Sequence, residues 1–147
     1  MHVFRRAAVL AASAALAFAV PAAAQDFPVV PGEYVEVTMI TVDDGHNLDY
    51  ANFLAGLWRQ QREFQKSQGW IMSYEILSNV YKRAGEPDLY LLTRSKNVPD
   101  AVEINRRDAL MRAQMKMTDA QMEASSGDRA KFRHVQGSTL LQVLNFK

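Results

Sequence analysis

The sequence predicts an α+β domain whose elements follow the order β-α-β-β-α-β. Segments rich in β-branched and aromatic residues lie near both ends of the chain and as a pair in its middle. Two segments with apolar residues at helical spacing separate that central pair from the outer strands. The chain has no cysteine, so packing rather than disulfide bonds must hold the domain together, and thiolate chemistry is excluded.

The first 24 residues have the plan of a secretory signal peptide. Arg5 and Arg6 precede an apolar run at 7–20, and an A-x-A triplet at 22–24 indicates cleavage before Gln25. The run is shorter than the roughly 20 residues of a membrane span. We therefore expect an exported, soluble protein, periplasmic or secreted, that has no membrane contact after cleavage. Loss of the two arginines changes the formal net charge from +1 to −1, which gives no reason to expect a nucleic-acid partner.

Local patterns indicate the first three elements. Residues 25–32, with two prolines and a glycine, predict an extended leader, so the domain proper covers 33–147. The stretch EYVEVTMITV at 33–42 is dense in β-branched residues and predicts a strand. Asn47 can cap a helix that runs to about residue 68, where Gly69 ends it.

The second half is predicted in the same way. The stretch GWIMSYEILSNVYKRAGEPDLYLLTRS reads as strands at about 70–82 and 88–95 around a tight turn. Pro99 suits the first turn of a helix that reaches about Met117. Thr118 and Gln121 match a capping box, so a helix restarts there, and Gly127 is expected to interrupt it. STLLQVLNF at 138–146 predicts the last strand.

This order is the ferredoxin-like split βαβ arrangement, in which a four-stranded antiparallel sheet carries two main helices on one face. Successive strand residues point to opposite faces, and the more uniformly apolar set, such as Val35, Val37 and Met39, is expected beneath the helices. The open face then mixes apolar with polar side chains: Ile40, Leu77, Tyr90, Leu92, Leu140, Leu144 and Phe146 with Glu36, Thr38, Glu75, Arg94 and Gln142. So many large apolar residues favour a covered surface, and a second copy of the sheet would cover it as a homodimer.

The element order over about 33–147, with one helix-covered and one mixed face, resembles the dimeric α/β-barrel superfamily. The resemblance implies a homodimer whose two sheets enclose a barrel, with ligand pockets between each sheet and the helices or loops. Members include oxygenases without cofactors, haem-handling enzymes, lyases and isomerases. The chain carries no catalytic signature of any of these groups, so fold analogy does not select a reaction.

Charged residues on the predicted sheet suggest a site. Antiparallel pairing would bring both Glu36 and Glu75 close to Arg94. In a structural interpretation Arg94 neutralises these carboxylates. In a functional one it binds a substrate carboxylate or enolate while a carboxylate acts as base. His46, in the turn DDGHN, is either a general base or metal ligand at a pocket mouth or a solvated turn residue.

The sequence thus favours an exported small-ligand-binding protein. One form of this function is a cofactor-independent enzyme of proton-transfer, lyase or isomerase type that acts on a small apolar or aromatic compound. The catalytic candidates are Glu36, Glu75, Arg94 and His46, and the ligand-binding candidates are Thr38, Asn79, Tyr90 and Gln142. We expect no metal and no cofactor.

Two alternatives stay open. One is a non-catalytic periplasmic binding or interaction protein. The other is haem or copper handling, by His134 or by Met111, Met115 and Met122.

Overall fold

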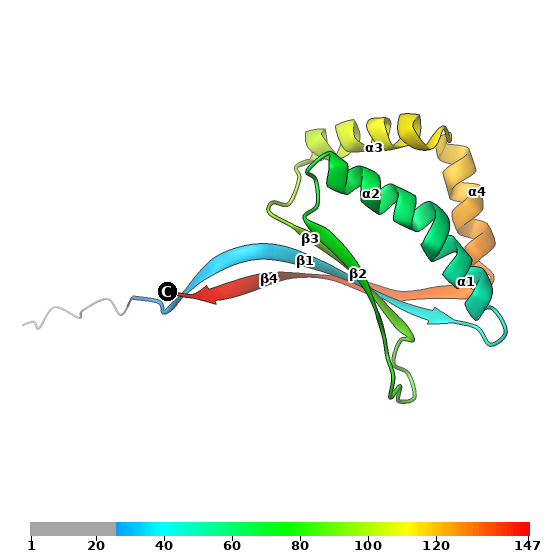
Figure 1. The fold of residues 1–147 in the computed structure, drawn as a ribbon, viewed down its shortest axis with the longest axis horizontal. Coiled ribbons are helices and arrows are strands. Elements are labelled where there is room, and N and C mark those ends of the chain that lie inside the picture. The colour runs from blue at the N-terminus through cyan, green and yellow to red at the C-terminus, as the bar shows by residue number, and fades with distance from the viewer. Residues whose placement is uncertain (1–25) are drawn as a thin grey trace, which may run out of the picture.

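The computed structural model describes residues 26–147, and its elements follow the predicted order (Figure 1). The elements are β1 (Val29–Val42), α1 (Asn47–Phe53), the π-helical turn η1 (Leu54–Trp58), α2 (Arg59–Ser67), β2 (Ser73–Ser78), β3 (Leu89–Ser95), α3 (Ala101–Met115), α4 (Asp119–Ala130) and β4 (Arg133–Phe146). The signal peptide predicted at 1–24 lies outside the described residues.

The four strands form one antiparallel sheet in the order β2-β3-β1-β4, and the helices lie on one side of it (Figure 1). This is an α+β architecture broadly compatible with a ferredoxin-like fold. β1 begins at Val29, so part of the expected leader pairs with β4. β4 begins at Arg133, five residues earlier than predicted, because it pairs back to Val42 at the far end of β1.

The β1–β4 ribbon extends beyond the rest of the sheet. β3 ends where Ser95 pairs with Tyr34, whereas β1 and β4 continue pairing as far as Val29 and Phe146. Figure 1 shows this ribbon reaching away from the helices toward the C-terminus. Register shifts at Pro31/Tyr34 and Met39/Ile40 mark irregularities in it, which is where strands commonly bend.

A compact core joins the first helix to the sheet. Tyr50, Leu54 and Trp58 recur every four residues along α1 and η1, and all three are buried. They pack on Ile40 of β1 and Leu91 of β3. The π-helical turn lies in the middle of this stripe, and such turns are frequent at functional sites.

Neither α3 nor α4, which form the second helical segment, has a buried residue, and their ends are defined by caps. Asp100 caps α3 by accepting a hydrogen bond from the Glu103 N–H, and Lys116 ends it with a left-handed φ of 52°. The predicted capping box of Thr118 and Gln121 is confirmed at the start of α4. The interruption predicted at Gly127 is wrong, since one exposed glycine lowers helix propensity without breaking the helix.

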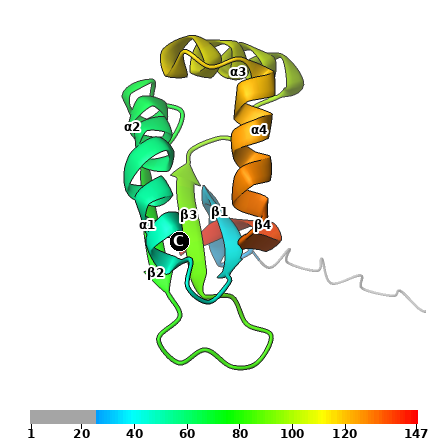
Figure 2. The ribbon, with the colours of Figure 1, turned by 90° about the vertical axis from the view of Figure 1, so that its right-hand side faces the viewer.

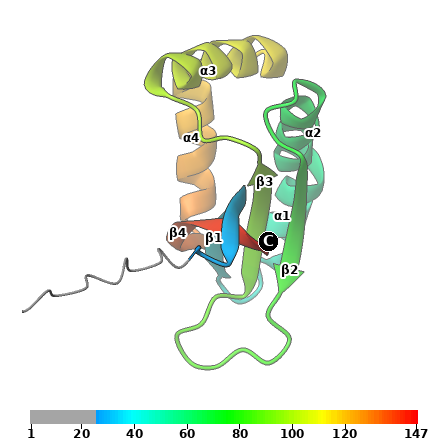
Figure 3. The ribbon, with the colours of Figure 1, turned by 90° about the vertical axis from the view of Figure 1, so that its left-hand side faces the viewer.

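Trp70 anchors α3 to the corner between α2 and β2. Its ring meets Phe64 edge-on at 5.5 Å between centroids, and the guanidinium groups of Arg106 and Arg107 lie 5.9 and 5.3 Å from it. Figures 2 and 3 show the result: α3 crosses the ends of α2 and α4, which stand as two columns on the sheet.

The faces predicted for β1 and β4 are wrong, while those predicted for β2 and β3 are confirmed. Ile40 lies in the helix-covered core with an exposed fraction of 1%, so Glu36 and Thr38 also face the helices. Val35 pairs with Arg94 on the opposite face. The expectation failed because the space beneath α3 and α4 is a cavity with polar groups rather than a uniformly apolar core.

Candidate functional site

Two cavities lie between the sheet and the helices. The larger, here called the large cavity, has a volume of about 650 Å³, and the smaller, the arginine cavity, has about 310 Å³. Glu36, Arg62 and Thr93 line both of them. The two cavities are therefore adjacent, with these three side chains between them.

Most of the surface that lines the large cavity is apolar, although polar side chains, among them Arg107 and Asp108, also line it. Trp70 and Ile71, both buried, form its floor near the start of β2, and Leu140 contributes from β4. Its remaining apolar lining comes from the segment before α3 and from the two helices above: Val98, Pro99, Ile104, Met111 and Met122. Pockets for drug-sized molecules typically have this range of volume and this composition.

The arginine cavity has a different character. Arg62 of α2, Arg129 of α4 and Arg133 of β4 line it, and Glu36 is the one carboxylate in its lining. Hydroxyl groups complete the polar wall: Thr38, Tyr50, Thr93 and Ser126. Three guanidinium groups around one carboxylate give the cavity a surplus of positive charge.

The Arg62 side chain is poorly satisfied for a group withdrawn from water. Its Nε is buried without a hydrogen-bond partner, and its Nη1 lies 3.5 Å from the Thr93 hydroxyl, at the limit of a hydrogen bond. Its guanidinium carbon is 5.7 Å from the Trp58 ring centroid. Burial lowers the pKa of Arg62, and the negative charge of Glu36 opposes this. No carboxylate within residues 26–147 forms an ion pair with it.

Arg129 and Arg133 show the same deficit. Both Nε atoms are buried without a partner, although Arg129 Nη1 donates to the Ser125 hydroxyl and the guanidinium stacks 4.0 Å from the Phe53 ring centroid. Burial lowers the pKa of Arg129, and the positive charge of Arg133 lowers it further. The Tyr50 hydroxyl lies beside both, and burial raises its pKa. The positively charged guanidinium groups of Arg129 and Arg133 thus lie in one cavity that is partly shielded from water.

The predicted convergence around Arg94 forms on the open face of the sheet and includes Glu75, but Glu33 takes the place of Glu36. Arg94 Nη1 donates to Glu33 at 2.9 Å and Nη2 to Glu75 at 3.5 Å. Glu36 pairs across the sheet with Thr93 and points to the helix side. The pKa of Arg94 is raised, chiefly by the hydrogen bond to Glu33. This guanidinium is already neutralised by two carboxylates.

The other predicted site residues are dispersed. His46 lies before α1, where its Nδ1 is 2.9 Å from Asp49 and its ring stacks on Phe132. Asn79, in the turn after β2, donates to Glu86 and to the Pro87 carbonyl. Tyr90 pairs with Met39 on the face away from the helices, and Gln142 donates to the Gly32 carbonyl at 3.3 Å. None of these four side chains lines either interior cavity.

Glu36 and Thr38 are the two predicted site residues that line these spaces. Thr38 lies 3.0 Å from the Ser138 hydroxyl across β1 and β4. Of the candidate haem and copper ligands, only Met111 and Met122 line one cavity. His134 is 3.0 Å from Asp43 at the surface, and Met115 lines the outer hollow rather than the large cavity.

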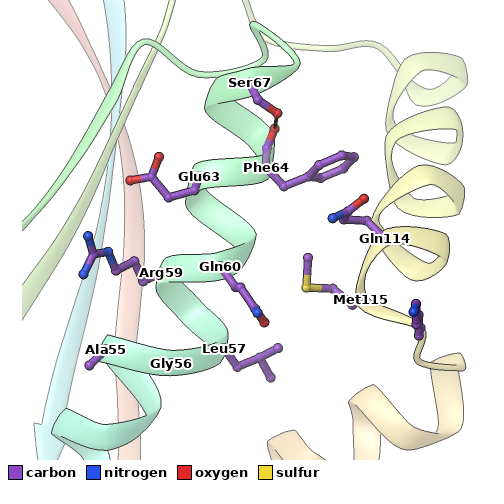
Figure 4. Close-up of a pocket in the computed structure, with 11 residues that line it drawn as sticks. Ala55, Gly56, Leu57, Arg59, Gln60, Glu63, Phe64, Ser67, Gln114 and Met115 are labelled. Carbon is purple, nitrogen blue, oxygen red and sulfur yellow. Dashed lines mark hydrogen bonds between the residues drawn. The ribbon is translucent and has the colours of Figure 1, made fainter.

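A third hollow of about 1050 Å³ lies outside this layer, between η1–α2 and the end of α3 (Figure 4). Leu57, Gln60 and Phe64 point toward α3, whereas Arg59 and Glu63 lie on the other side of the helix (Figure 4). The four buried side-chain atoms without a partner in residues 26–147 belong to Arg62, Gln65, Arg129 and Arg133, all of which line the interior cavities. The buried polar atoms that lack a hydrogen-bond partner in this part of the chain therefore belong to residues that line the two interior cavities rather than this outer hollow.

Sequence reasoning missed the three arginines. Arg62 had a usable signal, because it continues the four-residue spacing of Tyr50, Leu54 and Trp58 and so had to lie on the buried side of its helix. Arg129 and Arg133 had no such signal in the sequence. Arg129 lies in the last turn of α4 and Arg133 is the first residue of β4, so neither belongs to a run of buried residues with regular spacing.

Two further searches of residues 26–147 gave negative results. This part of the chain has no cluster of three or more histidine, aspartate and glutamate side chains placed to hold a metal ion. Its helices are all too short or too polar to cross a membrane. In comparisons with known proteins, neither a family model nor a curated sequence matches the chain.

Proposed function

We propose that this chain is an exported small-ligand-binding protein that holds a small apolar or aromatic compound in its large cavity. The observation that supports this most directly is the space of about 650 Å³, walled by Trp70, Ile71 and Leu140 and left open by helices that bury none of their own residues. A helix pair packed only for stability would bury its apolar side chains against the sheet, whereas Ile104, Met111 and Met122 line the open cavity instead.

Export is inferred from the signal peptide predicted at residues 1–24. A second copy of the chain would cover the open face of the sheet. The face away from the helices exposes Leu77 and Leu141 and includes the partly exposed Tyr90. A homodimer formed through this face would leave the interior cavities of each subunit intact, because they lie on the other side of the sheet.

Binding is tested with the neutral fluorescent probe N-phenyl-1-naphthylamine and the mature chain. We expect saturable fluorescence enhancement in the wild type and at least a tenfold loss of affinity in Leu140→Trp, whose larger ring projects into the cavity and occupies part of the binding space. Leu144→Trp is the matched control. Both leucines are on β4 with similar exposed fractions, 54% and 56%, but Leu144 lines neither interior cavity. Equal affinity in the two variants would refute binding in this cavity.

A catalytic function of proton-transfer type is the second candidate, and one observation favours it. Glu36 is a carboxylate at the junction of the two cavities, within the field of Arg62. It could accept a proton from carbon next to a carbonyl group. The test is exchange of the methylene protons of phenylacetone in heavy water, followed by NMR. Acceleration by the wild type but not by Glu36→Gln would support catalysis, and no acceleration would leave a binding protein.

A further inference from the structure

We propose that the arginine cavity is an oxyanion subsite, so that the ligand is an amphiphilic organic acid with its carboxylate or phosphate among Arg62, Arg129 and Arg133. This deepens the proposed function and rests on it. The apolar body would occupy the large cavity, and the acid group would pass the junction at Glu36 and Thr93.

Unmet hydrogen-bonding capacity is the first argument. An arginine has five N–H donors and no acceptor. Here the Nε of each of the three arginines is buried and has no partner among residues 26–147. Burying a donor without a partner is unfavourable by roughly 1–3 kcal/mol, and more for a charged group. Three such deficits around one cavity are better explained by a missing acceptor than by packing.

Charge is the second argument. Glu36 is the one acidic side chain among the groups that line the arginine cavity, against three guanidinium groups. Burial lowers the pKa of Arg129, and the positive charge of Arg133, which lines the same cavity, lowers it further, so the two guanidinium groups repel. An oxyanion would relieve this repulsion and could accept bidentate hydrogen bonds from a planar guanidinium.

A comparison with Arg94 on the other face supports this assignment. Arg94 has carboxylate partners at 2.9 and 3.5 Å, as is usual for an arginine that serves the fold. Arg62 and Arg133 have no such partner within the described part of the chain, although Glu36 lines the same cavity. The structure therefore leaves these donors available to a ligand.

The experiment compares three ligands with one aromatic body on the mature chain: 2-naphthamide, 2-naphthoate and 2-naphthyl phosphate. Isothermal titration calorimetry should show that at least one acid binds ten times more tightly than the neutral amide, which corresponds to one additional charge-assisted contact of about 1.4 kcal/mol. The better of the two acids identifies the headgroup. Arg62→Met and Arg133→Met should each reduce that preference for the acid over the amide about tenfold. Arg83→Met, in the exposed turn after β2, is the control and should change nothing.

Stability supplies a second readout. If the arginines serve the ligand, Arg62→Met removes an unpaired buried charge and raises the urea midpoint of the free protein. If they serve the fold, the midpoint falls, and that result would overturn the proposal. Equal affinity for acids and amide would overturn it as well. If the neutral naphthylamine probe binds and the acids do not, the subsite is refuted while the large cavity stands. If that probe also fails to bind, the proposed function itself is refuted.

Discussion

Arg94 donates a hydrogen bond from Nη1 to the Glu33 carboxylate across 2.9 Å, and its neighbour across the sheet is Val35 rather than Glu36. One residue of difference in the chain decides the face of a strand on which a carboxylate lies. Glu33 and Glu75 therefore neutralise Arg94 on the open face, and Glu36 stands free to line the cavities on the helix side.

This relationship predicts unequal effects of removing the two carboxylate charges. Glu33→Gln should lower the urea midpoint more than Glu75→Gln, because its hydrogen bond to Arg94 is shorter, 2.9 against 3.5 Å. Both decreases should be small and should shrink at 1 M salt, because the three side chains are partly exposed. Urea unfolding at two salt concentrations measures this. A larger effect of Glu75→Gln would contradict the geometry.

The proposed homodimer predicts that a charge on the open face prevents association. Leu77 has an exposed fraction of 47% and pairs with Tyr90 on that face. Size-exclusion chromatography with light scattering should give a dimer for the wild type and a monomer for Leu77→Glu. Leu48→Glu is the control, because Leu48 is exposed at the start of α1 in the helix layer. A monomeric wild type at high micromolar concentration would end the dimer proposal.

The backbone conformation of Lys116 predicts that a glycine at this position would stabilise the folded protein. Its φ of 52° is left-handed, a conformation that a residue with a Cβ adopts at a cost of roughly 1–2 kcal/mol. Lys116→Gly should therefore raise the free energy of unfolding, by up to about 1 kcal/mol after the greater flexibility of glycine in the unfolded chain is counted. Ala113→Gly, within α3, should lower it by about 1 kcal/mol. Urea unfolding of both variants checks the opposite signs, and a loss of stability in Lys116→Gly would contradict the prediction.

Glu103 predicts a specific response to acid. Hydrogen bonds from Arg106 and Arg107 lower the pKa of its carboxyl from 4.5 to about 2. A group whose pKa is lower in the folded state contributes stability above its unfolded pKa and loses it as the pH falls through the folded one. The contribution should therefore be complete above about pH 4.5 and disappear toward pH 2. Carbon-13 NMR titration of the side chain should find a midpoint near 2.

The same pH range can be checked with the variant Glu103→Gln. Glu103→Gln should lower the urea midpoint at pH 7, and its difference from the wild type should vanish as the pH approaches 2. Asp128 of α4 has a partner in Lys131, just beyond the end of that helix, so Asp128→Asn serves as a control for loss of a surface carboxylate away from α3. A midpoint for Glu103 near 4.5 would show that the arginine pair does not form in solution.

Local chemistry was sufficient to predict the order of elements. Thr118 and Gln121 form their capping box from neighbouring atoms alone, and the glycines at 45, 69 and 85 adopt positive φ in the expected turns. Periodicity also placed the first helix correctly, because Tyr50, Leu54 and Trp58 repeat at helical spacing.

The sequence by itself therefore determined which segments become helices and strands, since hydrogen bonds and side-chain spacing within a few residues decide that. Only the tertiary structure decided which face of β1 meets the helices, because register depends on pairing with β3 and β4. It also decided that Arg62, Arg129 and Arg133 share one cavity, since they come from three elements far apart in the chain. Their meeting depends on packing between these elements, which no local pattern encodes.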